Sequence, residues 1–432
     1  MRIWSNQVLE HVGETVELCG ALHRVRYLKD IAFLMLRDAR GLVQIVIEDA
    51  PTRTLLRQTL PESALRVEGV VVAGPQAPGG AELHQPTIAV LSAAVEPPPV
   101  DLHTPTLHVH ISTLLEHAPL TLRHPVQRAL LRLGSLSMAG FRHTLSTAGF
   151  TEIQSPKLVA AATEGGANVF AVQYFDRIAY LAQSPQFYKQ LAVGIFERVF
   201  EVGPVFRAEP HDTPRHLNQY TSLDMELGYI TDHTTVMAEV TATLRGMVKW
   251  IRDYGQTELT LLAADLPVVP DTIPRLHFTE AQDLILALTG EECRHEPDLT
   301  PAHERLLGAW AYENHGSDFL FVVGYPMRKR PFYTHPDPER PTYSKSFDLL
   351  FRGLELITGG QRLHRYDDYL AALAQHNLPA EPFAAYLAAF KHGMPPHGGF
   401  AIGLERWVAQ LTGRTNVRET TLFPRDLTRL TP

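Results

Sequence analysis

Hydrophobic and polar residues alternate in several short segments within the first 92 residues of the chain. The alternation, which places successive side chains on opposite faces of a strand, occurs at 15–22, 32–37, 42–47, 66–73 and 87–91. A stretch with helical spacing, 53–60, follows the third segment, and turns rich in glycine and proline separate others. The pattern predicts five strands and a helix, the order of an OB-fold barrel, with a generic small barrel as the alternative.

A proline-rich segment, EPPPV at 96–100, ends this region. Beyond it, Pro125 suits the first position of a helix, apolar residues recur at helical spacing from 126 onward, and Gly149 suits the helix end. We therefore expect a barrel domain at 1–95, a linker at 96–124 and a second domain at 125–432.

The second domain contains a predicted β-loop-β unit, with strands at 198–207 and 221–230 joined by a polar loop. Alternation in the second strand places Ser222, Asp224 and Glu226 on one face and apolar residues on the other. In the first strand, Arg207 and Glu209 share a face. The unit thus predicts a sheet surface that suits a charged ligand.

Two glycine-containing segments extend this picture. The segment 348–362 combines glycines, which permit close approach of the backbone, with Glu355, whose oxygens can bind a divalent metal. The segment 398–406 predicts a strand that leads into a helix at 404–411. Because the chain has neither a P-loop nor a dinucleotide glycine motif, side chains such as Arg207 would have to hold any nucleotide.

Composition narrows the functional classes. The chain has 432 residues, 45% of them hydrophobic, and is too long for one ordinary domain. It contains no run of roughly 18 apolar residues and no signal segment, so we expect a cytoplasmic protein without membrane contact. Cys19 and Cys293 fit buried hydrophobic positions better than a metal site or a disulfide. The net charge of −8 restricts nucleic-acid binding to a local basic patch.

Several segments resemble class II aminoacyl-tRNA synthetases. Those similar to the three motifs of that class are GFTEIQSP at 149–156, the segment 200–227 and GGFAIGLER at 398–406. The match narrows to aspartyl-tRNA synthetases of the compact archaeal type through TEGGAN at 163–168, QSPQFYKQ at 183–190 and FDLLFRGLELITGGQR at 347–362. The resemblance implies an α+β fold, with an antiparallel sheet flanked by helices behind the OB-fold barrel. It also implies a homodimer with Pro156 at the interface.

The resemblance assigns the site residues of the activation step. Arg207, Glu355 and Arg406 would be catalytic, and Glu355 and Thr358 would bind Mg²⁺, although the family usually has serine at the second position. The implied ATP-binding residues are Arg207, Glu209, Arg215, His216, Leu217, Tyr220, Glu355, Gly403, Leu404, Glu405 and Arg406.

For L-aspartate, the resemblance implies two cations, Lys189 and Arg362, at the side-chain carboxylate, and Glu164 and Asp224 at the ammonium group. Gln186, Arg207 and Thr358 complete the predicted subsite. Lys189 distinguishes this pattern from asparaginyl-tRNA synthetases, which lack the lysine. An amide offers donors to these cationic donors, whereas a carboxylate accepts from them.

The implied anticodon residues are His23, Arg24, Arg26, Phe33, Gln44 and Pro78. His23 and Pro78 resemble the relaxed members of the family, which charge both tRNA(Asp) and tRNA(Asn) and pass Asp-tRNA(Asn) to an amidotransferase. The alternatives are an enzyme restricted to tRNA(Asp), an asparaginyl-tRNA synthetase, a paralogue that makes free asparagine, and a non-catalytic tRNA-binding relic.

Overall fold

The computed structural model describes residues 2–160 and 168–431 of the chain. Contacts divide the chain into two compact units, Met1–Arg128 and Ala129–Pro432. Within the described ranges, no helix is both long enough and apolar enough to cross a membrane.

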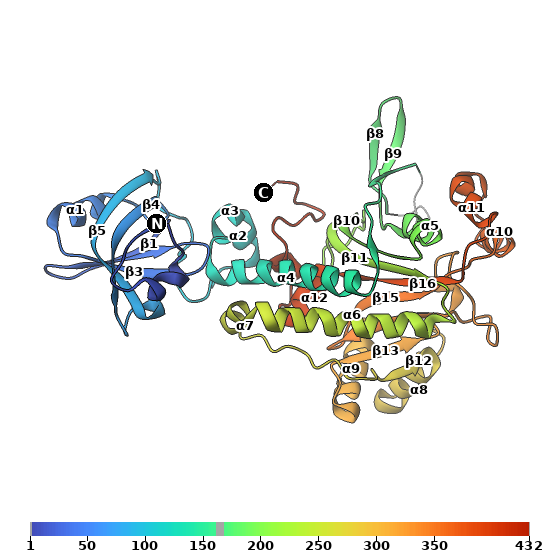
Figure 1. Ribbon diagram of the computed structural model, residues 1–432. Helices are drawn as coiled ribbons and strands as arrows, with labels where there is room; N and C mark the ends of the chain where they lie inside the picture. Colours follow the sequence, from blue (N-terminus) through green and yellow to red (C-terminus); the bar gives the residue numbers. More distant parts are fainter. Residues whose placement is uncertain (1, 161–167, 432) are drawn as a thin grey trace. The chain divides into compact units, whose positions relative to one another are not determined.

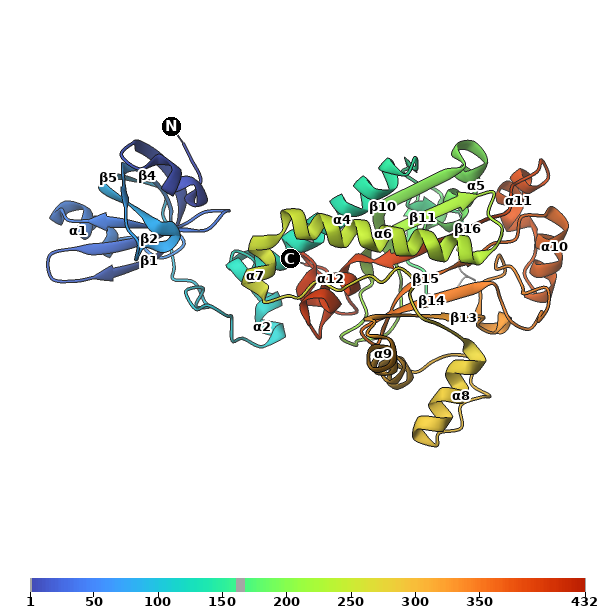
Figure 2. The ribbon, with the colours of Figure 1, turned by 60° about the horizontal axis from the view of Figure 1, so that its bottom comes forward.

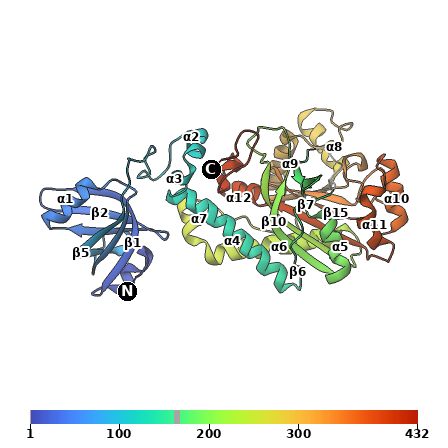
Figure 3. The ribbon, with the colours of Figure 1, turned by 90° about the horizontal axis from the view of Figure 1, so that it is seen from above.

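The first unit contains a closed five-stranded barrel in the order β1-β2-β3-β5-β4, which confirms the OB-like prediction (Figures 1 and 3). Its interior consists of alternating strand residues such as Leu18, Leu34 and Ile45, each 0% exposed. The strands are β1 (Thr15–Tyr27), β2 (Ala32–Arg37), β3 (Leu42–Ile47), β4 (Ala64–Ala73) and β5 (Ala81–Ser92), and α1 (Ala50–Gln58) follows β3.

Three strands are longer than the alternation predicted, β4 slightly and β1 and β5 by more. The register of β1 against β2 shifts between Leu22 and Arg24, and this bulge interrupts the period of two although the strand continues to Tyr27. β5 begins at Ala81 and has further register shifts against β4.

Cys19 is only partly buried, contrary to prediction, whereas Cys293 is buried, and both cysteines are free thiols.

Residues 96–124, predicted as a linker, include two short helices, α2 (Ile111–Glu116) and α3 (Ala118–Thr121). Leu114 and Leu115 of α2 are buried, as is Ala118 of α3. Burial of these side chains stabilises helices that would be too short to form alone.

The second unit is built on an eight-stranded sheet in the order β12-β13-β14-β15-β16-β11-β10-β6. Its pairings are antiparallel except β12 with β13 and β10 with β6. The strands are β6 (Thr151–Glu152), β10 (Arg198–Phe206), β11 (Gln219–Gly228), β12 (Arg275–His277), β13 (Phe319–Val323), β14 (Ser346–Phe351), β15 (Leu354–Gln361) and β16 (His397–Gly403). A smaller sheet has the order β7-β9-β8, formed by β7 (Leu158–Val159), β8 (Ala171–Tyr174) and β9 (Arg177–Leu181).

Helices cover both faces of the large sheet (Figures 1 and 2). Phe319 and Phe321 of β13 belong to the core cluster beneath α4 and α6, whereas Leu320 and Val322 belong to the cluster with α8 and α9. Alternate residues of one strand therefore enter different cores. The helices are α4 (Pro125–Thr147), α5 (Gln186–Phe196), α6 (His233–Tyr254), α7 (Gln256–Leu262), α8 (Phe278–Thr289), α9 (Pro301–His315), α10 (Tyr366–Gln375), α11 (Ala384–Phe390) and α12 (Leu404–Thr412).

The long helices α4 and α6 approach each other closely (Figure 2). A Cβ atom on Gly246 of α6 would lie 1.9 Å from Oγ1 of Thr144 and 2.8 Å from its Cβ. Gly149, with φ of +83°, follows the end of α4, as the sequence predicted. Only a hydrogen at position 246 is compatible with this helix contact.

We predict that Gly246→Ala destabilises the second unit by about 1 to 3 kcal/mol, because the added methyl group overlaps Thr144 and forces the helices apart. Thermal or denaturant unfolding measures the change. Gly134→Ala is the matched control: a Cβ there meets its nearest atom at 3.8 Å, so the higher helix propensity of alanine should leave stability equal or improved. Equal stability of the two variants would contradict the packing argument.

Candidate active site

The antiparallel strands β10 and β11 organise the site. Leu223 and Met225 of β11 point into the hydrophobic core, as the alternation predicted. Asp224 and Glu226 lie on the other face and are nonetheless buried, with 2% and 0% exposure. Arg207 directly follows β10, and its N–H donates to the carbonyl oxygen of Asn218 at 2.9 Å. This hydrogen bond extends the pairing of β10 with β11 by one residue pair, and it fixes the backbone from which the Arg207 side chain extends.

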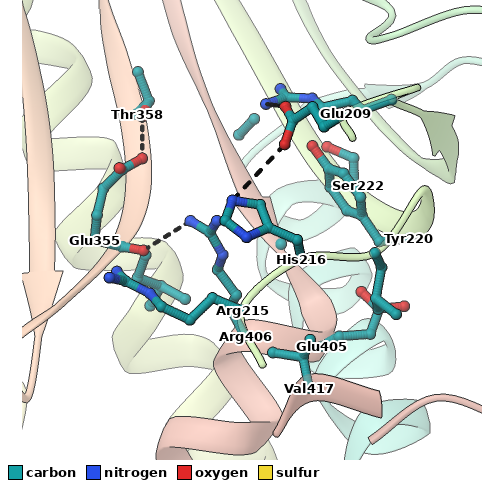
Figure 4. Close-up of a pocket in the computed structure, with 15 residues that line it drawn as sticks. Glu209, Arg215, His216, Tyr220, Ser222, Glu355, Thr358, Glu405, Arg406 and Val417 are labelled. Atoms are coloured by element: carbon teal, nitrogen blue, oxygen red, sulfur yellow. Dashed lines mark hydrogen bonds and ion pairs between the residues drawn. The ribbon is translucent and has the colours of Figure 1, made fainter. Parts of the chain in front are cut away.

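A pocket opens over β11, β15, β16 and the start of α12 (Figure 4). Every residue predicted to bind ATP lines it except Leu404, which is buried in the hydrophobic core. The complete lining is Arg207, Glu209, Arg215, His216, Leu217, Tyr220, Ser222, Glu355, Leu356, Thr358, Ala401, Gly403, Glu405, Arg406 and Val417.

The pocket combines an aromatic ring with several cations. The guanidinium carbon of Arg207 lies 5.7 Å from the centre of the Tyr220 ring. Nη1 of Arg406 donates to the backbone oxygen of Glu355 at 3.3 Å, which ties α12 to β15 (Figure 4). Burial of the His216 ring lowers its pKa, and the positive charge of nearby Arg406 lowers it further. The imidazole is therefore neutral near pH 7. Such a lining suits a planar base and a polyphosphate.

Glu405 has a different environment from the other predicted ATP-binding residues. Its carboxylate oxygens accept hydrogen bonds from the backbone N–H of Thr221 at 3.0 and 3.1 Å. Burial raises the pKa of Glu405 to about 7. The carboxylate therefore holds α12 against β11.

Three oxygen-bearing side chains of β14 and β15 lie together and fit a hard divalent cation. Oγ1 of Thr358 donates to Oε1 of Glu355 at 3.0 Å (Figure 4), and Thr358 pairs with Asp348 in the ladder. Oδ2 of Asp348 accepts from Arg330 at 3.0 Å, whereas its buried Oδ1 has no hydrogen-bond partner among the described residues. Burial raises the pKa of Asp348 to about 6. The carboxylate oxygens of Asp348 and Glu355 and the hydroxyl of Thr358 therefore form a ligand set that suits a divalent cation and includes Asp348, which the sequence-based assignment omitted.

The predicted aspartate subsite contains a cluster of four buried charges: Lys189, Asp224, Glu226 and Arg362. Nζ of Lys189 lies 2.9 Å from Asp224 and 3.3 Å from Glu226, and Nε of Arg362 donates to Glu226 at 3.0 Å. Although burial alone would raise the pKa of Glu226, Arg362 and Lys189 hold it below its usual value. Both cations therefore share the counter-ion Glu226, and Asp224 is paired with Lys189. The assignment of these residues to aspartate stays a prediction.

The sequence-based interpretation placed Glu226 on the carboxylate face but gave it no function. The paired positions of Lys189 and Arg362 were a signal that could have identified it, because two buried cations need buried counter-charge. A second missed group lies behind the cluster. Gln190 donates to the hydroxyl of Tyr369 at 3.0 Å and contacts Nε2 of His397 at 2.8 Å.

Of the other predicted aspartate-binding residues, Gln186 lies in the described part of the chain and Glu164 does not. Gln186 stands at the first position of α5, is 5% exposed, and has a buried Nε2 without a hydrogen-bond partner in the described part of the chain. Glu164 lies outside the described residues.

Comparison with known proteins decides the family. The model for class II tRNA synthetases (D, K and N) matches residues 110–427. The aspartate–tRNA(Asp/Asn) ligase of Thermus thermophilus is 48% identical, and that of Deinococcus radiodurans is 44% identical. These alignments cover 100% of this chain and 100% and 99% of the relatives, respectively. The chain belongs to the class II tRNA synthetases.

A solved class II tRNA synthetase has the same fold. The asparaginyl-tRNA synthetase from Pyrococcus horikoshii, complexed with asparaginyl-adenylate, superposes with a TM-score of 0.93 at 31% identity, over 100% of both chains. A barrel followed by a sheet flanked by helices is thus confirmed as the architecture. Because that structure is of an asparaginyl enzyme, the fold alone does not distinguish aspartate from asparagine.

In this synthetase, four of the six predicted anticodon residues lie on one outer face of the barrel. Arg26 of β1 pairs with Phe33 of β2, and its guanidinium lies 5.2 Å from the ring centre. In the neighbouring row, Arg24 pairs with Met35, which pairs with Gln44 of β3. Exposed arginines beside a half-buried aromatic ring suit single-stranded RNA.

The other two anticodon residues lie elsewhere. His23 is 7% exposed, bonded to Arg37 at 2.9 Å and packed edge-on against His103. The bulge in β1 turns it inward, away from the face that carries Arg24. Pro78 is exposed in the turn between β4 and β5. In this structure the His23 ring is buried, so its contact with an anticodon base stays a prediction.

Proposed function

We propose that this synthetase activates L-aspartate with ATP and transfers it to both tRNA(Asp) and tRNA(Asn). The observation that carries the amino-acid assignment is the buried pair of cations, Lys189 and Arg362, within one cluster beside the ATP pocket. The names of the relatives from Thermus thermophilus and Deinococcus radiodurans, aspartate–tRNA(Asp/Asn) ligases, support the choice of tRNAs.

In the activation step, an α-carboxylate oxygen of aspartate bonds to the α-phosphorus of ATP while the bond to pyrophosphate breaks. Arg207 and Arg406 line the pocket where charge develops on the phosphate, and preorganised cations stabilise that charge. Glu355, Thr358 and Asp348 would hold Mg²⁺, whose chemistry here is neutralisation and orientation of the phosphates. In the second step, the terminal ribose hydroxyl of tRNA attacks the aspartyl carbonyl carbon, and AMP leaves.

Selection of aspartate rests on Arg362. Its Nε bonds to Glu226, and Nη2 bonds to Glu226 and to the backbone oxygen of Gly399 at 3.0 Å. The guanidinium has a further nitrogen, Nη1, whose N–H groups can donate to either oxygen of a substrate carboxylate, whereas a side-chain amide offers one acceptor oxygen and an NH₂ group from which Nη1 cannot accept. Glu164, Gln186, Arg207, Asp224 and Thr358 remain the proposed remainder of this subsite.

We expect ATP–pyrophosphate exchange that depends on L-aspartate and Mg²⁺, with asparagine nearly inert. Arg362→Ala should reduce the aspartate-dependent kcat/KM by about a hundredfold or more, because it removes charge-assisted hydrogen bonds and leaves Lys189 as the remaining cation beside buried Glu226. Arg252→Ala, which changes an exposed arginine of α6, is the control and should behave as wild type. Comparable exchange with asparagine would rule out the proposed pocket.

We also expect the two tRNAs to be charged with similar efficiency. Exposed Pro78 offers neither a cation nor an N–H donor that could separate C from U at the third anticodon position. The measurement compares kcat/KM on tRNA(Asp) and tRNA(Asn) transcripts, and Asp-tRNA(Asn) should serve as a substrate for an amidotransferase. A preference for tRNA(Asp) beyond about a hundredfold, roughly 2.7 kcal/mol, would favour the restricted enzyme instead.

We also propose that the protein forms a homodimer and acts in the cytoplasm. β6 is the edge strand of the large sheet, and its two residues are exposed, as are Pro156 and Leu158. An open edge beside apolar side chains supports pairing with a second copy. Light scattering at working concentration should give twice the chain mass of 48.2 kDa, and the mass of a single chain would contradict the dimer.

A further inference from the structure

Glu304 is a buried carboxylate that neither the motifs nor the pocket lining includes. It lies in the first turn of α9 and is 6% exposed. Its Oε2 accepts two hydrogen bonds, from Nη2 of Arg215 at 2.7 Å and from the backbone N–H of Glu355 at 2.9 Å. Arg215 and Glu355 come from different segments and both line the ATP pocket (Figure 4). One oxygen atom therefore joins two parts of the site.

The hydrogen bond to Glu304 gives the backbone N–H of Glu355 an acceptor at a position that is not paired with β16. Pairing of β15 with β16 begins at Ile357, opposite Ile402, and the ladder between β14 and β15 shifts register beside Glu355. The backbone of Glu355 thus lies beyond the β16 pairing. Its N–H is bound by Glu304 and its carbonyl oxygen by Arg406. These two side chains fix the backbone from which the proposed metal ligand extends.

The position of Glu304 is itself fixed by close packing of α9 on the turn between β14 and β15. A Cβ atom on Gly308 would lie 2.5 Å from the backbone nitrogen of Gly353, and one on Gly353 would lie 2.8 Å from Cα of Arg305. Gly353 also has a φ of +74°, which favours glycine. The helix consequently cannot shift relative to the turn without breaking this contact.

The bond to Arg215 constrains the polar loop between β10 and β11. Arg215 is partly exposed, whereas the Glu304 side chain is 9% exposed, so the ion pair is anchored at its carboxylate end. Without an anchor, a long arginine side chain on a loop would sample many rotamers, and ordering it on ligand binding would cost free energy.

We propose that Glu304 is a positioning residue for ATP: it holds Arg215 and Glu355 in a fixed relation across the site before the nucleotide binds. The inference rests on the proposed function, because it takes the pocket to be the ATP site. Preorganised charges avoid the cost of rearrangement when the phosphates arrive. The effect should therefore fall on ATP and Mg²⁺, not on aspartate.

The test compares Glu304→Gln with Glu258→Gln. Glu258 is also a buried helical carboxylate bonded to an arginine, Arg132, at 2.7 Å, but it lies outside the pocket lining. We expect Glu304→Gln to raise the ATP Kd, measured calorimetrically with Mg²⁺ present and aspartate absent, by about tenfold, as loss of a charge-assisted bond predicts. The KM for ATP and the Mg²⁺ requirement should rise in parallel, while the KM for aspartate changes less than about twofold.

Glu258→Gln should leave all these ATP parameters unchanged, and thermal unfolding shows whether each variant is folded. In an Arg215→Ala background, the effect of Glu304→Gln should become smaller, because one of its two bonds is already lost. A folded Glu304→Gln protein with wild-type ATP affinity, or equal loss in both glutamate variants, would overturn the inference. Failure of the wild type to bind ATP would instead refute the proposed function.

Discussion

Burial of four charges in one cluster constrains how the elements of the second unit assemble. Lys189, Asp224, Glu226 and Arg362 are each 7% exposed or less. Charges removed from water are tolerated only when opposite charges and hydrogen bonds compensate them. The four residues come from α5, from β11 and from the position after β15, so the cluster forms only when these elements are all in place. The charge balance and the arrangement of the sheet therefore depend on each other.

The glycine-rich segments serve this cluster as well as the pocket. A Cβ atom at Gly399 would lie 2.2 Å from Oε2 of Glu226 and 2.0 Å from the backbone oxygen of Met225. The carbonyl oxygen of Gly399 accepts from Nη2 of Arg362 at 3.0 Å. The sequence analysis attributed close approach of the backbone to the glycines of 348–362, and the structure shows the same property at Gly399. At position 399 the approaching group is the protein's own carboxylate.

The features that could be predicted from the sequence are those set by local periodicity. Alternation in β11 separated core residues from Asp224 and Glu226 correctly, and proline and glycine marked the ends of α4. The helices α2 and α3, with six and four residues, are too short to show a period. The functions of Glu226 and Glu304 were missed because their partners are remote: Arg362 is 136 residues from Glu226, and Arg215 is 89 residues from Glu304. Such pairings arise from tertiary structure, which periodicity does not describe.

The same cluster gives a physical account of how aspartate differs from asparagine as a ligand. Asp224 and Glu226 carry two negative charges, and Lys189 and Arg362 carry two positive charges, so the cluster is neutral when all four are ionised. Without Lys189 its net charge would be −1, which suits the ammonium group of an amino acid with a neutral side chain. Aspartate carries one more negative charge than asparagine, and in the proposed subsite the positive charge of Lys189 would offset it. In the proposed subsite Lys189 would therefore act through charge balance, because its own hydrogen bonds go to Asp224 and to the backbone oxygen of Phe400.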